Sequence, residues 1–174
     1  TPGRSAAATC RPPAFPLTAG ARVVLRRHQT LRATLEWSHA LLTPDEQTVY
    51  RRLGVFAGSF TLESAQYVVQ DARIDPWAAL DHLGALVDKS LVLAEGDPVP
   101  RYRLLETARA YALERLAEGR ETQAMMRRHA EALRQLLTAF EREDQEKGVT
   151  SAGMGVAAAE LDNLRAALAW SAAA

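Results

Sequence analysis

The chain has 174 residues, 48% of them hydrophobic, and its 21 Lys and Arg residues balance 21 Asp and Glu residues. This apolar content is enough for a packed core and excludes disorder over most of the chain. The zero formal net charge is atypical of a free-standing nucleic-acid binder, because such proteins neutralise phosphate with a basic surface. With Cys10 as the one cysteine, an intrachain disulfide and a cysteine metal cluster are excluded.

The first segment, 1–27, is rich in Pro, Ala and Ser and has no apolar core of a signal peptide. Because the chain begins at Thr1, we expect a fragment of a longer protein, with this segment as a lead-in or linker. No apolar run reaches the roughly 18–20 residues that a membrane helix needs. We therefore expect a cytoplasmic protein with no membrane contact.

Helical spacing begins at residue 28 and continues to residue 42. The sequence "TPDE" then predicts a new helix, with Thr43 as its N-cap, proline in the first turn and Glu46 completing a capping box. We expect Val49, Tyr50 and Leu53 to face inward. Phe56, which lies beyond them in the chain, is also expected to face inward. Gly58 is the expected breaker.

Two further caps predict two further helices. Thr61 precedes a short helix with Leu62, Ala65, Val68 and Val69 at helical spacing, and Asp75-Pro76 opens a helix that runs to about Lys89. In the latter we expect the buried side to consist of Leu80, Leu83 and Val87.

Two short β-type runs follow, "SLVLAEG" and "RYRLL", and the turn "GDPVP" separates them. Runs of this kind around a Gly/Pro turn predict a β-hairpin. Three helices followed by a hairpin are the element order of a winged helix. The second run passes into a helix over about 107–118 with no Gly, Pro or Asn between them, so we expect a direct strand-to-helix joint.

A longer helix is predicted beyond Gly119. Its apolar positions are expected at Met126, Ala130, Leu133, Leu137 and Phe140. The polar stretch 141–156 reads as a loop or a frayed end, and "ELDNLRAALAW" places Leu161, Leu164 and Leu168 on one helical face. The fold class is therefore mainly α with a small β-hairpin: a winged helix-turn-helix domain at 28–118, followed at 119–174 by an antiparallel helical, TPR-like extension.

Enzymatic signatures are absent from the sequence. There is no phosphate-binding loop, no dinucleotide turn and no nucleophile elbow. The histidines, His28, His39, His82 and His129, do not form a pair at metal-binding helical spacing. We expect no catalytic residue, no metal and no cofactor in this chain.

Two sets of residues are candidates for binding an anion. In a DNA-reading winged helix the third helix enters the major groove with Arg, Lys, Asn or Gln on base edges. Here that helix offers Asp81, His82 and Asp88, so Lys89 and the wing residues Arg101 and Arg103 are the remaining DNA donors. The second set, Arg26, Arg27, His28 and Arg32, is either a solvated entry segment or a contact for a phosphate or an acidic domain.

Five segments carry a family resemblance: "RRHQTLRATLEWSHALLTPDEQTVYRRLGVFAGSFTLESA", "LVDKSLV", "RYRLLETARAYALERL", "RRHAEAL" and "ELDNLRAALAW". In this order they resemble a region of large LuxR- and SARP-like bacterial transcriptional regulators that bind ATP, the STAND ATPases related to NB-ARC proteins. The resemblance implies an upstream ATPase core with a helical domain, a regulatory winged helix, and TPR-like repeats behind it. ATP or ADP is then the ligand of the parent protein, which is an ATPase.

The resemblance also singles out residues at the strand-to-helix joint. In NB-ARC relatives a Met-His-Asp motif follows the wing, and its histidine reaches toward the nucleotide. The matching positions are Leu104, Leu105 and Glu106, and a leucine in the histidine position cannot donate a hydrogen bond to phosphate. Arg26 is a second departure, because the family pattern has a proline there.

Together these observations predict a non-catalytic regulatory and interaction module. It would couple the nucleotide state of the upstream ATPase domain to the downstream repeats of the same chain, with self-association as a further possibility. DNA would be bound by another domain. The alternative is a winged helix that binds DNA directly through Lys89, Arg101 and Arg103.

Overall fold

The computed structural model describes residues 30–96, 99–147, 155 and 157–173. The predicted lead-in and the candidates Arg26, Arg27 and His28 lie outside these residues. A helical segment over 30–40 comes first. Then follow α2 (Pro44–Leu53), α3 (Leu62–Val69), α4 (Pro76–Asp88), β1 (Leu93–Glu95), β2 (Arg101–Arg103), α5 (Glu106–Glu118), α6 (Thr122–Lys147) and α8 (Leu161–Ala173).

The three predicted N-caps are confirmed. The hydroxyl of Thr43 accepts from the backbone N–H of Glu46 at 3.3 Å, and the Glu46 carboxylate accepts from the N–H of Thr43 at 2.8 Å. Thr61 accepts from the N–H of Ser64 and Asp75 from the N–H of Ala78. Each cap satisfies backbone donors that the first helical turn leaves unpaired, which fixes where α2, α3 and α4 begin.

The predicted hairpin is confirmed, and one residue outside it pairs with its second strand as an isolated β-bridge. β1 and β2 pair antiparallel, with Ala94 opposite Tyr102. Phe60, between α2 and α3, exchanges both backbone hydrogen bonds with Tyr102, at 2.8 and 2.9 Å. The wing is therefore anchored to the segment that connects the first two helices of the domain.

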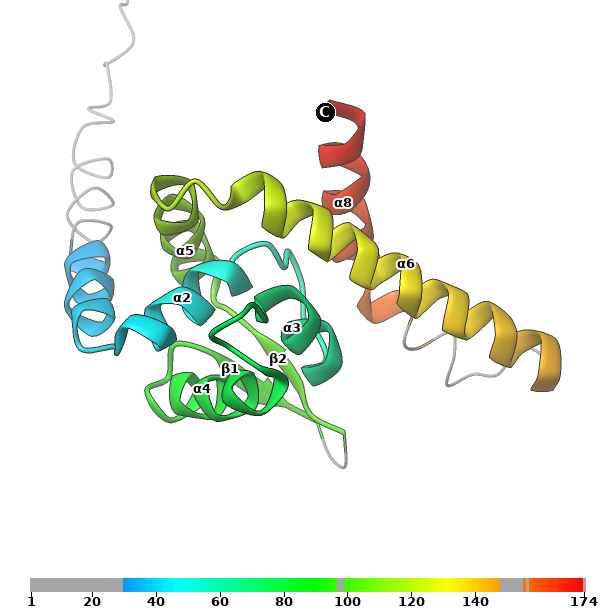
Figure 1. The fold of residues 1–174 in the computed structure, drawn as a ribbon, viewed down its shortest axis with the longest axis horizontal. Helices are drawn as coiled ribbons and strands as arrows, with labels where there is room; N and C mark the ends of the chain where they lie inside the picture. Colours follow the sequence, from blue (N-terminus) through cyan, green and yellow to red (C-terminus); the bar gives the residue numbers. More distant parts are fainter. Residues whose placement is uncertain (1–29, 97–98, 148–154, 156, 174) are drawn as a thin grey trace, which may run out of the picture.

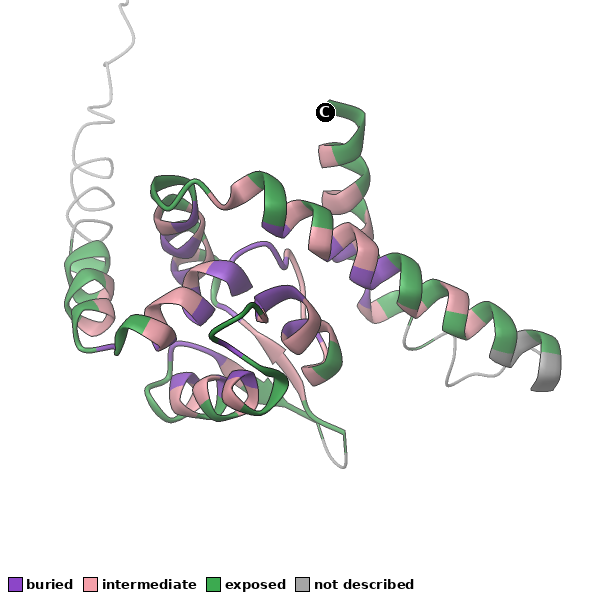
Figure 2. Cartoon of the chain, in the orientation of Figure 1, coloured by how far each residue is buried: buried purple, intermediate pink, exposed green. Residues whose placement is uncertain are grey.

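The core lies where α2, α3, α4 and α5 meet, and Figure 2 shows the buried residues gathered there. Tyr50, Leu53 and Phe60 are fully buried in it, and the Tyr50 hydroxyl donates to the backbone carbonyl of Ala108 on α5 at 2.8 Å. On α4 the buried side chains are Ala79, Leu83 and Leu86. The prediction of Leu83 is confirmed, whereas Leu80 and Val87 are half-buried, because the face in contact with α2 is rotated by one residue.

The helical extension consists of α6, which crosses over α3, and α8, which packs against α6 (Figure 1). Of the two alternatives for 141–156, the loop was wrong up to residue 147, since α6 continues to Lys147. This stretch has strong helix formers and no Gly or Pro. The predicted apolar face was also wrong in part. Among the described side chains of α6, the buried ones are Met125, His129, Ala132 and Leu133, while Leu137 is 36% exposed.

No helix among the described residues is both long and apolar enough to cross a membrane.

Candidate functional site

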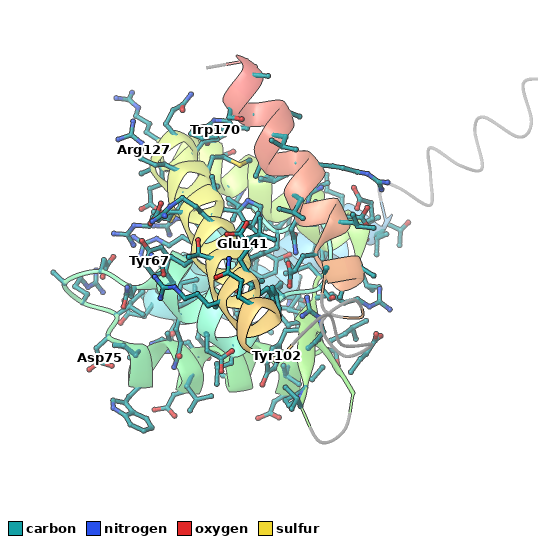
Figure 3. All side chains as sticks on the ribbon, turned by 90° about the vertical axis from the view of Figure 1, so that its right-hand side faces the viewer. Tyr67, Asp75, Tyr102, Arg127, Glu141 and Trp170 are labelled. Carbon is teal, nitrogen blue, oxygen red and sulfur yellow. The ribbon has the colours of Figure 1, made fainter. Side chains whose placement is uncertain are left out.

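The outer face of α4 is the surface with which a winged helix reads DNA, and here it is acidic. Trp77, Asp81, Gly84 and Asp88 are exposed on it at helical spacing, opposite the buried Leu83. The helix contains no Arg, Lys, Asn or Gln. In Figure 3, Asp75 at the start of α4 and Tyr102 of the wing lie at the bottom of the view, away from Trp170 of α8. Carboxylates on this face would repel the phosphates of an approaching duplex.

Lys89, which follows α4, is bound within the domain. Its ammonium lies 2.5 Å from the carboxylate of Glu46, whose side chain is 7% exposed. Burial alone would raise the pKa of Glu46, but the hydrogen bonds from Lys89 and Thr43 outweigh it and lower that pKa. Lys89 therefore neutralises the carboxylate of the capping box at the start of α2.

The wing arginines also have internal partners. The Arg101 guanidinium donates to the hydroxyl and to the carbonyl of Ser59, each at 2.9 Å, and to the carboxylate of Glu160 at 2.5 Å. Arg103 donates twice to Glu95 across the hairpin, at 3.0 and 2.9 Å. The two pairs differ in burial: the Glu160 side chain is 3% exposed and that of Glu95 is 59% exposed. An exposed pair is worth little and exchanges partners readily, so Arg103 is the more available cation.

The strand-to-helix joint is as short as predicted. β2 ends at Arg103 and α5 begins at Glu106. Leu104 is 8% exposed and belongs to the core, whereas Leu105 is 49% exposed and occupies the N-cap position of α5 without a side-chain cap. The Glu106 side chain is 81% exposed and lies 3.7 Å from Arg109. The joint thus holds Leu104 inward and turns Leu105 and Glu106 outward.

Arg32 is the described member of the N-terminal basic set. It forms ion pairs with Glu36 at 3.0 Å and with Glu114 of α5 at 2.8 Å, and so joins the helical segment 30–40 to α5. An open cleft of about 280 Å³ lies between these two elements, with Leu31, Leu35 and Tyr111 among its apolar walls. Arg32 and Glu106 both line this cleft, so the structure brings these two predicted residues together, whereas Arg101 and Arg103 are not among its lining residues.

Two residues that bind the wing or the 57–59 loop beside it were missed by the sequence reasoning. Glu160, just before α8, holds Arg101, and Asn163 of α8 is fully buried against the 57–59 loop. The signal was the three polar residues within "ELDN", which interrupts an otherwise apolar stretch. Among the described residues no three His, Cys, Asp or Glu side chains gather as a metal site would require.

A family model described as a winged helix-turn-helix domain matches residues 42–117. This range agrees with the three helices, the wing and the α5 helix of the structure. Residues 42–117 form a winged helix-turn-helix domain.

The chain is also homologous to longer mycobacterial proteins. It is 45% identical over 158 residues to the "Putative HTH-type transcriptional regulator Rv0890c" of Mycobacterium tuberculosis, a match that covers 89% of this chain and 17% of that protein. A Mycobacterium bovis protein with the corresponding name, Mb0914c, matches equally well. The "Uncharacterized protein Rv0894" of M. tuberculosis is 43% identical over 124 residues, which is 70% of this chain and 32% of that protein. The chain therefore spans less than a third of each of these relatives. No solved structure matches it significantly.

Proposed function

We propose that this chain is a regulatory and interaction module of a transcriptional regulator and that its winged helix does not itself read DNA. The observation that carries the proposal is the charge arrangement of the DNA-facing surface. Lys89, Arg101 and Arg103 are each paired with a carboxylate of the chain, and α4 presents Asp81 and Asp88 without a compensating base.

The energetics support this proposal. To bind phosphate while α8 stays in place, Arg101 would have to leave Glu160, whose buried carboxylate would then keep only the neutral amide of Asn163 as a partner. Breaking a buried ion pair in this way costs about 3–5 kcal/mol, and one phosphate contact in water does not offset such a cost. The same argument applies to Lys89, because the side chain of its partner Glu46 is also buried.

We further propose that the parent protein is a STAND-type ATPase, in which this module couples the nucleotide state of an upstream core to downstream helical repeats. ATP or ADP and the neighbouring domains of the same chain are then its ligand and partners, and another domain contacts DNA. The family resemblance of the five segments supports this. So does the joint at Leu105 and Glu106, whose exposed side chains are free to meet a neighbouring domain.

A chain that includes the upstream core tests the coupling. Glu106→Gln and Leu105→His should alter the rate of nucleotide exchange or the basal transcription, with Leu137→Ala on α6 as a control at another exposed leucine. The coupling is wrong if the Leu105 and Glu106 variants leave nucleotide exchange, oligomerisation and transcription all unchanged. Self-association and a cytoplasmic location of the parent stay predictions.

Direct DNA binding is the second candidate function. The winged helix-turn-helix match and the printed name of the Rv0890c relative favour it. A fluorescence-anisotropy titration of labelled duplex DNA with this chain at low salt separates the two candidates. Direct binding predicts a salt-dependent signal that Arg101→Gln with Arg103→Gln abolishes, whereas the regulatory module predicts no signal.

A further inference from the structure

The contact between α8 and the winged helix rests on two polar side chains. Asn163 accepts hydrogen bonds from the backbone N–H groups of Ala57 and Gly58, at 2.9 and 3.0 Å. Its amide nitrogen donates to the carbonyl of Ser59 at 2.7 Å and to the carboxylate of Glu160 at 2.8 Å. All four hydrogen-bonding positions of the Asn163 amide are thus filled in a fully buried place.

Only asparagine meets these demands at this position. An aspartate accepts from the two N–H groups but cannot donate to the Ser59 carbonyl, and its charge would face that of Glu160. Glu160 in turn places its other oxygen on the guanidinium of Arg101 in the wing. The 57–59 loop and the wing therefore bind the Asn and the Glu of a Glu-x-x-Asn pattern at the start of a helix.

The 57–59 loop is held in place by contacts that do not involve α8. Arg109 of α5 donates to the Phe56 carbonyl at 2.7 Å, and Arg101 binds both the hydroxyl and the carbonyl of Ser59. Gly58 completes the fit, because a Cβ at this position would lie 3.3 Å from the Cβ of Asp162. A preorganised surface loses little conformational freedom when its ligand docks.

No apolar side chain of α8 is fully buried, although Leu164 and Trp170 are half-buried. Asn163 is the one buried side chain among Leu161–Ala173, and Leu161 and Leu168 are 47% and 68% exposed. Elements with few buried apolar contacts open at low free energy while the rest of the domain stays folded. In Figure 1, α8 accordingly projects beyond the domain, with α6 beside it.

We propose that the winged helix carries a recognition site for helix starts of the form Glu-x-x-Asn, and that α8 is its reversibly docked ligand. Release of α8 uncovers the 57–59 loop and removes Glu160 from Arg101, which stays bound to Ser59, so one contact links the helical extension to the wing. The proposal does not depend on whether the chain binds DNA, and the experiments below do not involve DNA.

Hydrogen exchange in the intact chain tests the docking. Asn163→Asp should accelerate exchange of the α8 amides, and of the Ala57 and Gly58 amides bonded to Asn163, by at least about tenfold. This is the effect of losing one or two buried hydrogen bonds, and exchange over 44–56 and 60–118 should not change. Gly58→Val should do the same by steric exclusion. The control Ala169→Asp adds the same charge at an exposed position of α8 and should leave Asn163 and its contacts intact. Unchanged exchange of α8 in both variants, or equal acceleration in the α2–α5 core, would overturn the proposal.

A labelled peptide of residues 157–173 tests recognition between separate molecules. The Asn163→Asp chain is the receptor, because its own α8 competes less strongly for the site than the native α8. The native peptide should bind at least about tenfold more tightly than a peptide carrying Asn163→Asp, and Leu168→Ala in the peptide should change nothing. If the native and Asn163→Asp peptides bind alike, or neither binds, the site does not recognise this pattern.

Discussion

Arg52 of α2 and Glu121, in the turn before α6, form an ion pair in which Nε lies 2.9 Å from the carboxylate. The same guanidinium binds Asp71 at 2.7 Å and the Val69 carbonyl at 2.6 Å, with its side chain 8% exposed. One arginine thus joins α2, the end of α3 and the start of the helical extension. This is the same use of charge as in the wing, where Arg101 holds Glu160.

Replacing Arg52 by methionine should destabilise the domain by about 1–3 kcal/mol, because Asp71 loses its ion pair and the Val69 carbonyl loses its donor. Glu121 keeps its ion pair with Arg51. Urea denaturation followed by circular dichroism measures this. Arg134→Met, which removes an exposed ion pair with Glu131 on α6, is the control and should leave the midpoint unchanged. Equal effects of the two substitutions would mean that the Arg52 network does not hold the domain together.

Two glycines should respond in opposite ways to alanine. A Cβ at Gly54 would lie 3.0 Å from the Cβ of Ala112 and 3.1 Å from backbone atoms, so Gly54→Ala should separate α2 from α5 and cost about 1–3 kcal/mol. Nothing lies within 4 Å of a Cβ at Gly84 in α4, so Gly84→Ala should stabilise by about 0.5–1 kcal/mol. Thermal melts of the two variants and of the native chain show whether each substitution lowers or raises the Tm. A Gly54→Ala melt at or above the native Tm would contradict the close packing.

Stability should depend on pH through His129. The pKa of this imidazole is lowered to about 4, because burial and the charge of Arg109 together outweigh the neighbouring Asn163, which raises it. Below pH 6.5 the unfolded chain binds a proton at this position that the folded chain does not bind, so stability falls as the pH falls. The loss should lie between pH 6.5 and 4 and amount to at most about 3 kcal/mol.

His129→Phe is the comparison for this pH dependence, since a ring remains against Phe56, whose centroid lies 5.0 Å from that of His129. Unfolding free energies at a series of pH values should vary less for the variant than for the native chain in that window. Parallel profiles for the two chains would assign the pH dependence to other groups.

The elements that the sequence predicted well are those set by local interactions. Thr43, Thr61 and Asp75 each cap a helix through a backbone N–H three residues ahead, so their effect can be read from the neighbouring residues alone. The hairpin was predicted for the same reason, from two β-type runs around a Gly/Pro turn.

The details that sequence reasoning missed depend on partners far along the chain. Which face of α6 is buried depends on α3 and α8, and a shift of one residue moves the buried position from Met126 to Met125. Asn163 meets a loop about a hundred residues earlier, and Glu160 meets the wing. Lys89 and Arg101 likewise pair with carboxylates far along the chain, so the sequence could propose them as DNA donors but could not exclude them.

Reversing the charge of α4 should create DNA binding. Asp81→Arg with Asp88→Arg places two cations on the exposed face, and binding of duplex DNA should then weaken with salt with a slope of about −2 on logarithmic axes. A control with Glu118→Arg and Glu141→Arg, also on exposed helix faces, changes the net charge equally and should not produce this binding. Equal gains in the two variants would show that net charge rather than the α4 face limits DNA binding.

Titration of labelled duplex DNA with the unmodified chain at about 50 mM salt, where electrostatic binding is strongest, tests the central claim most directly. Because Lys89, Arg101 and Arg103 are paired internally and α4 is acidic, we predict no change in anisotropy. Binding that is abolished by Arg101→Gln with Arg103→Gln would contradict this account and establish the wing as a DNA contact.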